Sequence, residues 1–325
     1  MIKTSERLWK TSIYIAVVAL CGLLLAISAW AQETGEKTFA SPHDAGTALY
    51  DAVKAGDKSA MATVLGPSAG PIIGSGDEVQ DKKNQQFFID HYEQMNRWGK
   101  ETNGDQTLFM GVDNWPFPVP LKKAASGQWY FDTKAGVDEI LYRRIGKDEY
   151  AAMRVCQALA DAQVEYFEGL HDGSTVHQYA QKFLSEPGKQ NGLYWKTAEG
   201  EPQSPIGPII VYATGEGYTK GEEGKNTPFH GYYYRILTAQ GPDAPGGAKS
   251  YIVDGKLTGG FAFVAYPAEY RNSGVMTFVV NLNGVTFEKD LGPKTADLAK
   301  AMTAINPDKT WRAVSLEAED EAESQ

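Results

Sequence analysis

Residues 148–170 form the pattern that most restricts the fold, because their apolar side chains recur every three or four positions. Since an α-helix rises about 1.5 Å per residue, this spacing predicts one amphipathic helix about 35 Å long. Its apolar stripe consists of Ala152, Val155, Cys156, Leu159, Tyr166, Phe167 and Leu170. A stripe of that length needs an equally long apolar surface to cover it.

The covering surface is expected downstream, where β-forming stretches alternate with turn signals. Strands are predicted at residues 232–239, 250–253, 261–266, 275–282 and 285–289. Asn283-Gly284, between the last two, is the pair most typical of a tight hairpin. Both faces of the strand at 275–282 are apolar, which is typical of a central strand. We therefore expect a long helix packed on an antiparallel sheet, with a shorter helix at residues 175–184 between them.

The earlier part of the chain places helices before strands. Ser41-Pro42 is a typical helix start, and Ala55-Gly56-Asp57 separates that helix from a short second one. A third helix is predicted at residues 84–98, followed by strands at residues 107–112 and 128–131. This order predicts a second α+β unit. The expected fold class is therefore α+β in two modules, residues 39–136 and residues 137–314.

Proline occupies every second position in Trp115-Pro116-Phe117-Pro118-Val119-Pro120. The missing backbone donors confine this segment to an edge strand or a polyproline conformation. It could serve as a ligand for the aromatic groove of another protein. The favoured interpretation is that Trp115 and Phe117 pack onto their own module while the prolines protect a sheet edge.

Residues 1–31 have the features of an export signal. Three basic residues precede an apolar stretch at residues 13–27, and Ala29-Trp30-Ala31 is the small-x-small pattern that signal peptidase cuts. An uncleaved membrane anchor and a lipoprotein anchor at Cys21 are the alternatives. We expect export to the periplasm, with secretion as the alternative. Contact with the membrane is expected only through an uncleaved leader.

Cleavage would change the net charge from −10 to −12, because it removes three basic residues and one acidic residue. This charge argues against nucleic acid as a partner. Residues 315–325 hold five acidic residues and no basic one, which predicts a solvated, disordered tail. Cys156 would be the single remaining cysteine, so no intramolecular disulfide is expected. Its place on the apolar stripe predicts a buried structural thiol.

Patterns that would indicate an enzyme occur here only in unsuitable settings. Gly66-Pro67-Ser68-Ala69-Gly70 matches G-x-S-x-G, but it follows a predicted helix instead of the strand that presents a nucleophilic serine. A helix-ending loop is therefore predicted. His171 and His177 flank a Gly-Ser break instead of lying one helical turn apart as zinc-binding histidines do. The sequence predicts no catalytic residue, no metal ligand and no cofactor.

Five polar residues interrupt apolar or aromatic stretches and therefore need partners: Arg143, Arg144, His230, Arg235 and Glu269. One hypothesis places them in a ligand or partner site where the sheet meets the first module. His230 and Glu269 would exchange protons there. The other hypothesis, which is favoured, is a structural salt bridge such as Arg235 with Glu269.

Parts of the chain resemble known folds. The first module resembles the cone-shaped NTF2-like fold through Ala52-Val53-Lys54-Ala55-Gly56-Asp57 and Gly127-Gln128-Trp129-Tyr130-Phe131-Asp132. That resemblance implies a curved sheet wrapped on helices, with a pocket at its mouth. The second module resembles the globular part of type IV pilins and type II secretion pseudopilins through Gly231-Tyr232-Tyr233-Tyr234-Arg235-Ile236-Leu237 and Gly274-Val275-Met276-Thr277-Phe278-Val279-Val280-Asn281. A pilin-like fold, without the pilin leader that polymerisation requires, is what this resemblance implies.

From about residue 39 to residue 314, the chain resembles the uncharacterised bacterial family known as domain of unknown function 2950. The stretches that carry this resemblance are Asp113-Asn114-Trp115-Pro116-Phe117-Pro118, Tyr142-Arg143-Arg144-Ile145-Gly146, Gly192-Leu193-Tyr194-Trp195, His230-Gly231-Tyr232-Tyr233-Tyr234-Arg235-Ile236-Leu237-Thr238 and Ala265-Tyr266-Pro267-Ala268-Glu269-Tyr270. The resemblance implies no particular activity.

The sequence favours an exported, non-enzymatic protein that acts as an interaction or assembly component of the cell envelope, with an envelope protein as its partner. The alternative is a binding module for a small ligand or glycan fragment, which requires an apolar cavity with a few convergent polar groups in residues 39–133. An interaction scaffold instead requires that side chains fill the interior of the cone-shaped first module, and that an aromatic patch is exposed on the surface. A hydrolase, the third reading, requires His230 within hydrogen-bond reach of Glu269 or of a hydroxyl group.

Overall fold

The computed structural model describes residues 37–198, 200–215, 218 and 227–316. The predicted leader at residues 1–31 and nearly all of the predicted tail at residues 315–325 lie outside the described residues. Helices and antiparallel sheets occur together, so the predicted α+β class is confirmed. Within the described ranges, no helix is both long and apolar enough to cross a membrane.

The part of the chain before residue 132 folds as helices followed by a sheet, as expected. The helical elements are α2 (Pro42–Lys54), α3 (Lys58–Leu65), η1 (Pro67–Ala69), α4 (Gly70–Ile73) and α5 (Glu78–Gln94). The strands are β1 (Asn96–Lys100), β2 (Gln106–Met110), β3 (Trp115–Pro116), β4 (Leu121–Lys123) and β5 (Trp129–Phe131), in the order β1-β2-β4-β5 with β3 paired to β2. The N-terminal helix starts where predicted, because Ser41 accepts a hydrogen bond from the Asp44 N–H as an N-cap.

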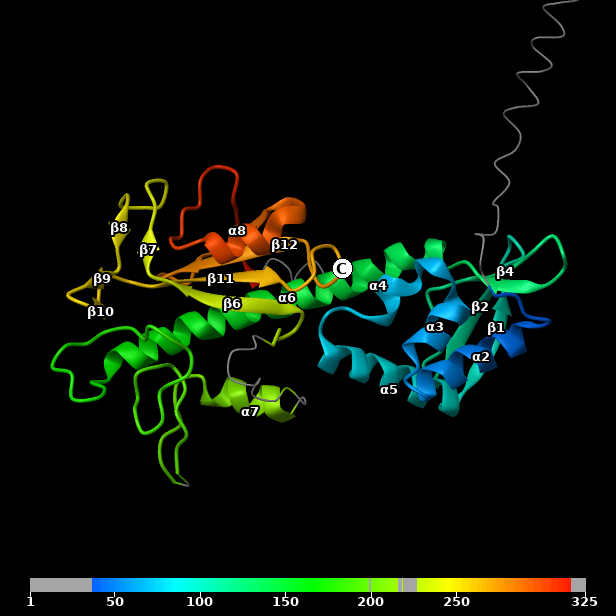
Figure 1. Cartoon of the computed structure of the whole chain (residues 1–325), viewed down its shortest axis with the longest axis horizontal. Helices are drawn as coiled ribbons and strands as arrows, with labels where there is room; N and C mark the ends of the chain where they lie inside the picture. Colours follow the sequence, from blue (N-terminus) through cyan, green and yellow to red (C-terminus); the bar gives the residue numbers. More distant parts are fainter. Residues whose placement is uncertain (1–36, 199, 216–217, 219–226, 317–325) are drawn as a thin grey trace, which may run out of the picture.

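A single helix, α6 (Thr133–Glu168), then runs through both halves of the molecule (Figure 1). Its 36 residues correspond to a length of about 54 Å. It begins 15 residues before the predicted start at residue 148, and it ends before Leu170, which is exposed. The predicted boundary between residues 136 and 137 therefore falls inside one continuous helix.

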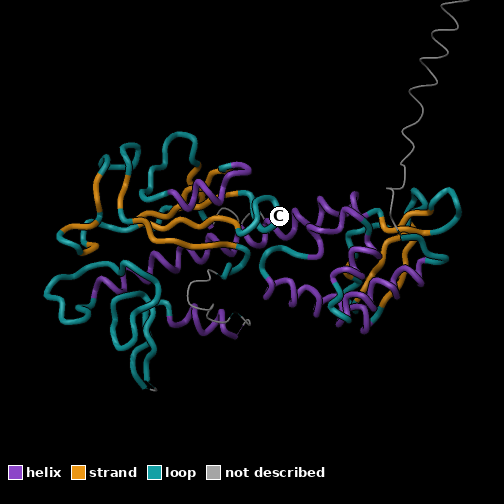
Figure 2. The backbone as a smooth tube through the Cα atoms, viewed as in Figure 1, coloured by secondary structure: helices purple, strands orange, loops and turns teal. Residues whose placement is uncertain are grey.

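The remaining elements include a second five-stranded sheet, which lies against the C-terminal part of α6 (Figure 2). Its order is β14-β13-β12-β11-β6, and α6 packs on β11 and β12. These elements are α7 (Gly207–Gly215), β6 (Tyr232–Leu237), β7 (Ala239–Gln240), β8 (Lys249–Ser250), β9 (Ile252–Val253), β10 (Lys256–Leu257), β11 (Ala262–Pro267), β12 (Met276–Asn281), β13 (Thr286–Asp290), η2 (Gly292–Lys294), α8 (Thr295–Ala301) and β14 (Arg312–Val314).

Several details of this second part agree with the sequence. The strand predicted to be central is β12, the third of five. Asn283-Gly284 turns between β12 and β13, with Gly284 at φ +75°, and the Asn281 side chain accepts from the N–H groups of Asn283 and Val285. Cys156 is fully buried, as predicted.

Two hydrophobic cores result, one on each half of α6. The first core, which includes Leu49, Phe88, Leu108 and Phe117, joins α2, α3 and α5 to the first sheet. The second core joins the C-terminal half of α6 to β6, β11 and β12. On α6, Ile140 packs against the first core, whereas Ala152 and Met153 belong to the second.

One helix prediction was wrong, and another had the wrong bounds. Residues 175–184 are not helical, because their backbone groups bond to other parts of the fold. Gln163, fully buried on α6, binds both the N–H and the C=O of Ala180, and the Tyr179 N–H donates to Leu257 O. The third helix is α5 instead of residues 84–98: it starts early, capped by Asp77, and gives way to β1 at Asn96.

Candidate ligand pocket

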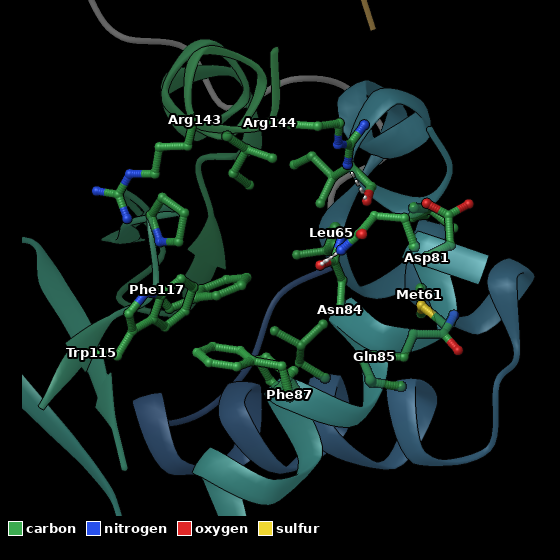
Figure 3. Close-up of a pocket in the computed structure, with 18 of the residues that line it drawn as sticks. Met61, Leu65, Asp81, Asn84, Gln85, Phe87, Trp115, Phe117, Arg143 and Arg144 are labelled. Atoms are coloured by element: carbon green, nitrogen blue, oxygen red, sulfur yellow. Dashed lines mark hydrogen bonds between the residues drawn. The ribbon is translucent and has the colours of Figure 1, made fainter. Parts of the chain in front are cut away.

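A cavity of about 420 Å³ lies between α6 on one side and α3, α4, α5 and residues 115–118 on the other (Figure 3). This volume is within the range of small-molecule sites, which are mostly 300–1,000 Å³. The apolar lining residues are Leu49, Val53, Met61, Leu65, Ile72, Ile73, Phe87, Phe88, Trp115, Phe117, Pro118 and Ile140. The polar lining residues are Gln80, Asp81, Asn84, Gln85, Arg143, Arg144, Lys147 and Asp148.

The proline-rich segment supplies the aromatic wall. Trp115 and Pro116 pair with β2, and the Phe117 N–H donates to Leu108 O at 2.8 Å, which turns the buried Phe117 ring toward the first core. The rings of Phe87 and Trp115 meet edge to face at 5.4 Å, and those of Phe88 and Phe117 do so at 5.6 Å. The prediction that Trp115 and Phe117 pack onto their own module is confirmed.

Three buried carboxyl groups lie at or beside the polar end: Asp77, Asp81 and Asp148. Asp77 caps α5 by accepting from the N–H groups of Val79 and Gln80, and its second oxygen accepts from the Tyr218 hydroxyl at 2.7 Å and from the Gly231 N–H at 3.1 Å. Asp81 accepts from the Ser75 hydroxyl at 2.7 Å and from the Ser75 N–H at 3.0 Å. Both are therefore satisfied by neutral donors of the protein.

Asp148 is different, because its carboxyl group accepts no hydrogen bond from any described residue. Its side chain lines the cavity, and the residue is 3% exposed. Burial raises the pKa of this carboxyl group to about 8, although the charge of Arg144 opposes that rise. Asp77 and Asp81 add to the rise by repulsion. At neutral pH, Asp148 is therefore largely a neutral acid at a cavity wall.

The backbone just before β6 lies close to Asp148, and Gly231 makes this approach possible. It has φ +72°, and a Cβ atom there would lie 2.7 Å from Asp148 Oδ2. Only glycine combines that backbone conformation with that space.

Arg144 fixes α6 to the elements around the cavity. Its guanidinium group donates to Pro71 O at 2.6 Å, Ile72 O at 3.3 Å and Asn272 Oδ1 at 2.7 Å. Arg143, one residue earlier, is exposed and pairs with Glu139 at 2.7 Å. Figure 3 shows both arginines on the α6 side, with Arg143 toward Trp115 and Phe117 and Arg144 toward Asp81. Arg143 is therefore a group of the rim, whereas Arg144 is a structural tie.

The other three predicted site residues lie elsewhere. The His230 N–H donates to the Tyr218 hydroxyl, its ring packs against Phe229 at 4.2 Å, and burial lowers its pKa. Glu269 accepts from the Asn272 amide at 2.6 Å and lines a separate polar cleft of about 580 Å³. No hydrogen bond joins His230 to Glu269 among the described residues.

The predicted salt bridge between Arg235 and Glu269 was wrong. Arg235 donates to Ala299 O at 2.6 Å and to Lys300 O at 2.8 Å, the carbonyl groups in the last turn of α8. Both are among the last four carbonyl groups of α8, which lack the usual N–H partner four residues later, although Ala299 O also accepts from the Met302 N–H at 3.3 Å. The negative end of the helix dipole also attracts a cation. Arg235 therefore binds the C-terminal end of α8 and does not line the cavity.

Sequence reasoning missed the buried acids. Asp148 lies four residues before Ala152 and eight before Cys156, on the same face of α6. An acid that continues an apolar stripe was the available signal. Within the described ranges, no three His, Cys, Asp or Glu side chains are grouped so as to hold a metal ion.

Comparison with known proteins identifies the family. The chain belongs to the family described as "Protein of unknown function (DUF2950)", which matches residues 36–314. The family resemblance seen in the sequence is thereby confirmed. No curated protein and no solved structure matches the chain, so the NTF2-like and pilin-like resemblances gain no support.

Proposed function

We propose that this protein is exported and binds one small amphipathic molecule in the cavity between α6 and the first core. The cavity carries the proposal, because it joins an aromatic and aliphatic wall to polar groups that include Asp148, whose carboxyl group has no donor among the described residues. Ligand sites combine these two features. The apolar body of the ligand would contact Phe87, Trp115 and Phe117, and its polar end would face Asp148.

The cavity favours this function over the assembly role that the sequence suggested. An interaction scaffold would fill the space between its helices and its sheet with its own side chains, since close packing stabilises a core. The large apolar part of the lining also favours an amphipathic ligand over a glycan fragment. Binding in the periplasm is part of the proposal and depends on the predicted leader.

Filling the cavity from its rim tests the proposal. Asn84 and Gln86 are both exposed on α5, and each takes part in one hydrogen bond between side chains four residues apart, with Gln80 and Asp90 respectively. Only Asn84 lines the cavity (Figure 3). Asn84→Trp places an indole there, whereas Gln86→Trp adds the same group outside and is the matched control.

The measurement is a titration of the mature protein with the fluorescent apolar amine N-phenyl-1-naphthylamine. Wild type and Gln86→Trp should bind one molecule saturably, and Asn84→Trp should bind at least tenfold more weakly. Equal affinities for the two variants, or no saturable binding to the wild type, would overturn the proposal.

A further inference from the structure

We infer that the ligand carries a protonated amino group and that Asp148 is the group that accepts it. This inference rests on the proposed function, because it specifies the polar end of the same ligand. A hydrophobic amine, with an aromatic or aliphatic body and a single ammonium group, is the chemical class that the cavity fits.

The hydrogen bonds around the acids point to Asp148. Asp77 is occupied by four donors of the protein and Asp81 by the two donors of Ser75. Asp148, equally buried and on the cavity wall, receives none from the described residues. A buried carboxyl group without a donor is costly, and an ammonium group in the cavity would supply up to three donors. The carboxyl oxygens of Asp148 are therefore available to accept hydrogen bonds from a ligand.

The charges point to a cation. Arg144 is the cation that acts most strongly on Asp148, but it donates to Pro71, Ile72 and Asn272 and to none of the three carboxyl groups. An ammonium group beside Asp148 would be held in a water-poor environment, where an ion pair is strong. The aromatic wall adds to this, since ring faces attract cations.

Two cations at the rim, Arg143 and Lys147, could attract an anionic ligand, but this attraction is weaker than that of Asp148 for a cation. Arg143 is exposed and already paired with Glu139, and Lys147 is exposed. Pairs between exposed charges contribute little to binding because water and salt screen them. An acid held at the rim would also leave Asp148 without a partner.

Protons compete with an amine for Asp148. The charged groups that act on it are Arg144 and Lys147 on α6, with Asp77 and Asp81 at the start of α5. Tyr218, Tyr232 and Tyr234 also interact electrostatically with Asp148, but burial raises their pKa values, so all three stay neutral in this range. Because the pKa of Asp148 is about 8, the fraction of carboxylate falls about fivefold between pH 8 and pH 7 and about tenfold for each further pH unit. Affinity for an amine should fall in parallel.

The test compares three probes with one aromatic body: 2-phenylethylamine, 2-phenylethanol and 3-phenylpropanoate. Calorimetric titrations use the mature wild type, Asp148→Asn, and Asp138→Asn as an exposed control on the same helix. At pH 8, the wild type and Asp138→Asn should bind the amine at least tenfold more tightly than the alcohol. Asp148→Asn should bind the two equally. The preference of the wild type for the amine should shrink about fivefold between pH 8 and pH 7, and almost disappear at pH 6.

The other outcomes separate this inference from the proposed function. Equal binding of amine and alcohol by the wild type, or tightest binding of the propanoate, would overturn the inference and leave the pocket in place. An amine preference that persists in Asp148→Asn would overturn the role of Asp148. Binding of the alcohol shows that this variant is folded. If none of the probes binds to the wild type, the inference fails together with the proposed pocket.

Discussion

At the scale of single residues, Asp148 carries a cost to stability that its neighbours do not offset. The pKa of its carboxyl group is about 8 in the folded protein, against an ordinary value of 3.8. Between pH 4 and pH 8, the unfolded chain therefore loses a proton that the folded chain keeps. Stability falls as the pH rises through that window. Destabilising groups of this kind are common where a protein binds a ligand.

Asp148→Asn should therefore stabilise the protein. At pH 7 the free energy of unfolding should rise by on the order of 3 kcal/mol, whereas at pH 4 it should rise by less than about 1 kcal/mol, because the acid is then protonated in the folded state and still partly protonated in the unfolded chain. Urea unfolding at pH 4, 7 and 9 measures this, with Asp138→Asn as the exposed control. A variant less stable than the wild type at pH 7 would show that Asp148 has a favourable charged partner in the fold.

Only some of the cavity residues, and not Asp148, could be predicted from the sequence. Searching for polar residues within apolar stretches found Arg143 and Arg144, both of which line the cavity. It missed Asp148, because an acid just before an apolar stripe is typical of a helix start and does not by itself indicate a buried position. It also misplaced Arg235, whose partners on α8 depend on which face of the sheet the helix covers. A linear pattern identifies a residue that needs a partner, but it does not identify the partner.

At the scale of elements, Gln163 decides the conformation of residues 175–184. Gln163→Ala should lower the free energy of unfolding by about 2–3 kcal/mol, because it leaves the buried N–H and C=O of Ala180 without partners. Gln157→Ala, which removes an exposed hydrogen bond to Asp161 on the same helix, should cost less than about 0.5 kcal/mol. Urea unfolding gives both values, and hydrogen exchange at Ala180 should speed up only in Gln163→Ala. Equal costs would mean that the contact with Gln163 does not hold this segment.

The elements that could be predicted are those fixed by local chemistry. The Ser41 cap, the Asn283-Gly284 hairpin and the apolar stripe of α6 depend on residues close in sequence. Residues 175–184 could not be predicted, because their conformation is set by a side chain on α6 and by a strand more than seventy residues away. The cavity has the same origin, since α6 closes it over residues 49–118.

At the scale of the whole molecule, α6 and a few polar contacts join the two cores. The helix passes from one core to the other without a break, so the boundary predicted between residues 136 and 137 falls inside it. Arg144 ties α4 to Asn272, and Asp77 ties the start of α5 to Tyr218 and Gly231. Because Arg144 also lines the cavity, the shape of the cavity depends on how the two cores are held together.

Arg144→Lys should weaken this connection. Lysine keeps the charge but lacks the planar guanidinium group that reaches three acceptors at once, so we expect a loss of about 2 kcal/mol. The wild type should unfold in one calorimetric transition, whereas the variant should unfold in two as the cores separate. Exchange of amide hydrogens should increase in α4 and near Asn272.

Arg143→Lys is the matched control, and it should behave like the wild type, because Arg143 is exposed and its pair with Glu139 survives the change. A single, unshifted transition in Arg144→Lys would mean that α6 alone couples the cores and that the cavity does not depend on this arginine.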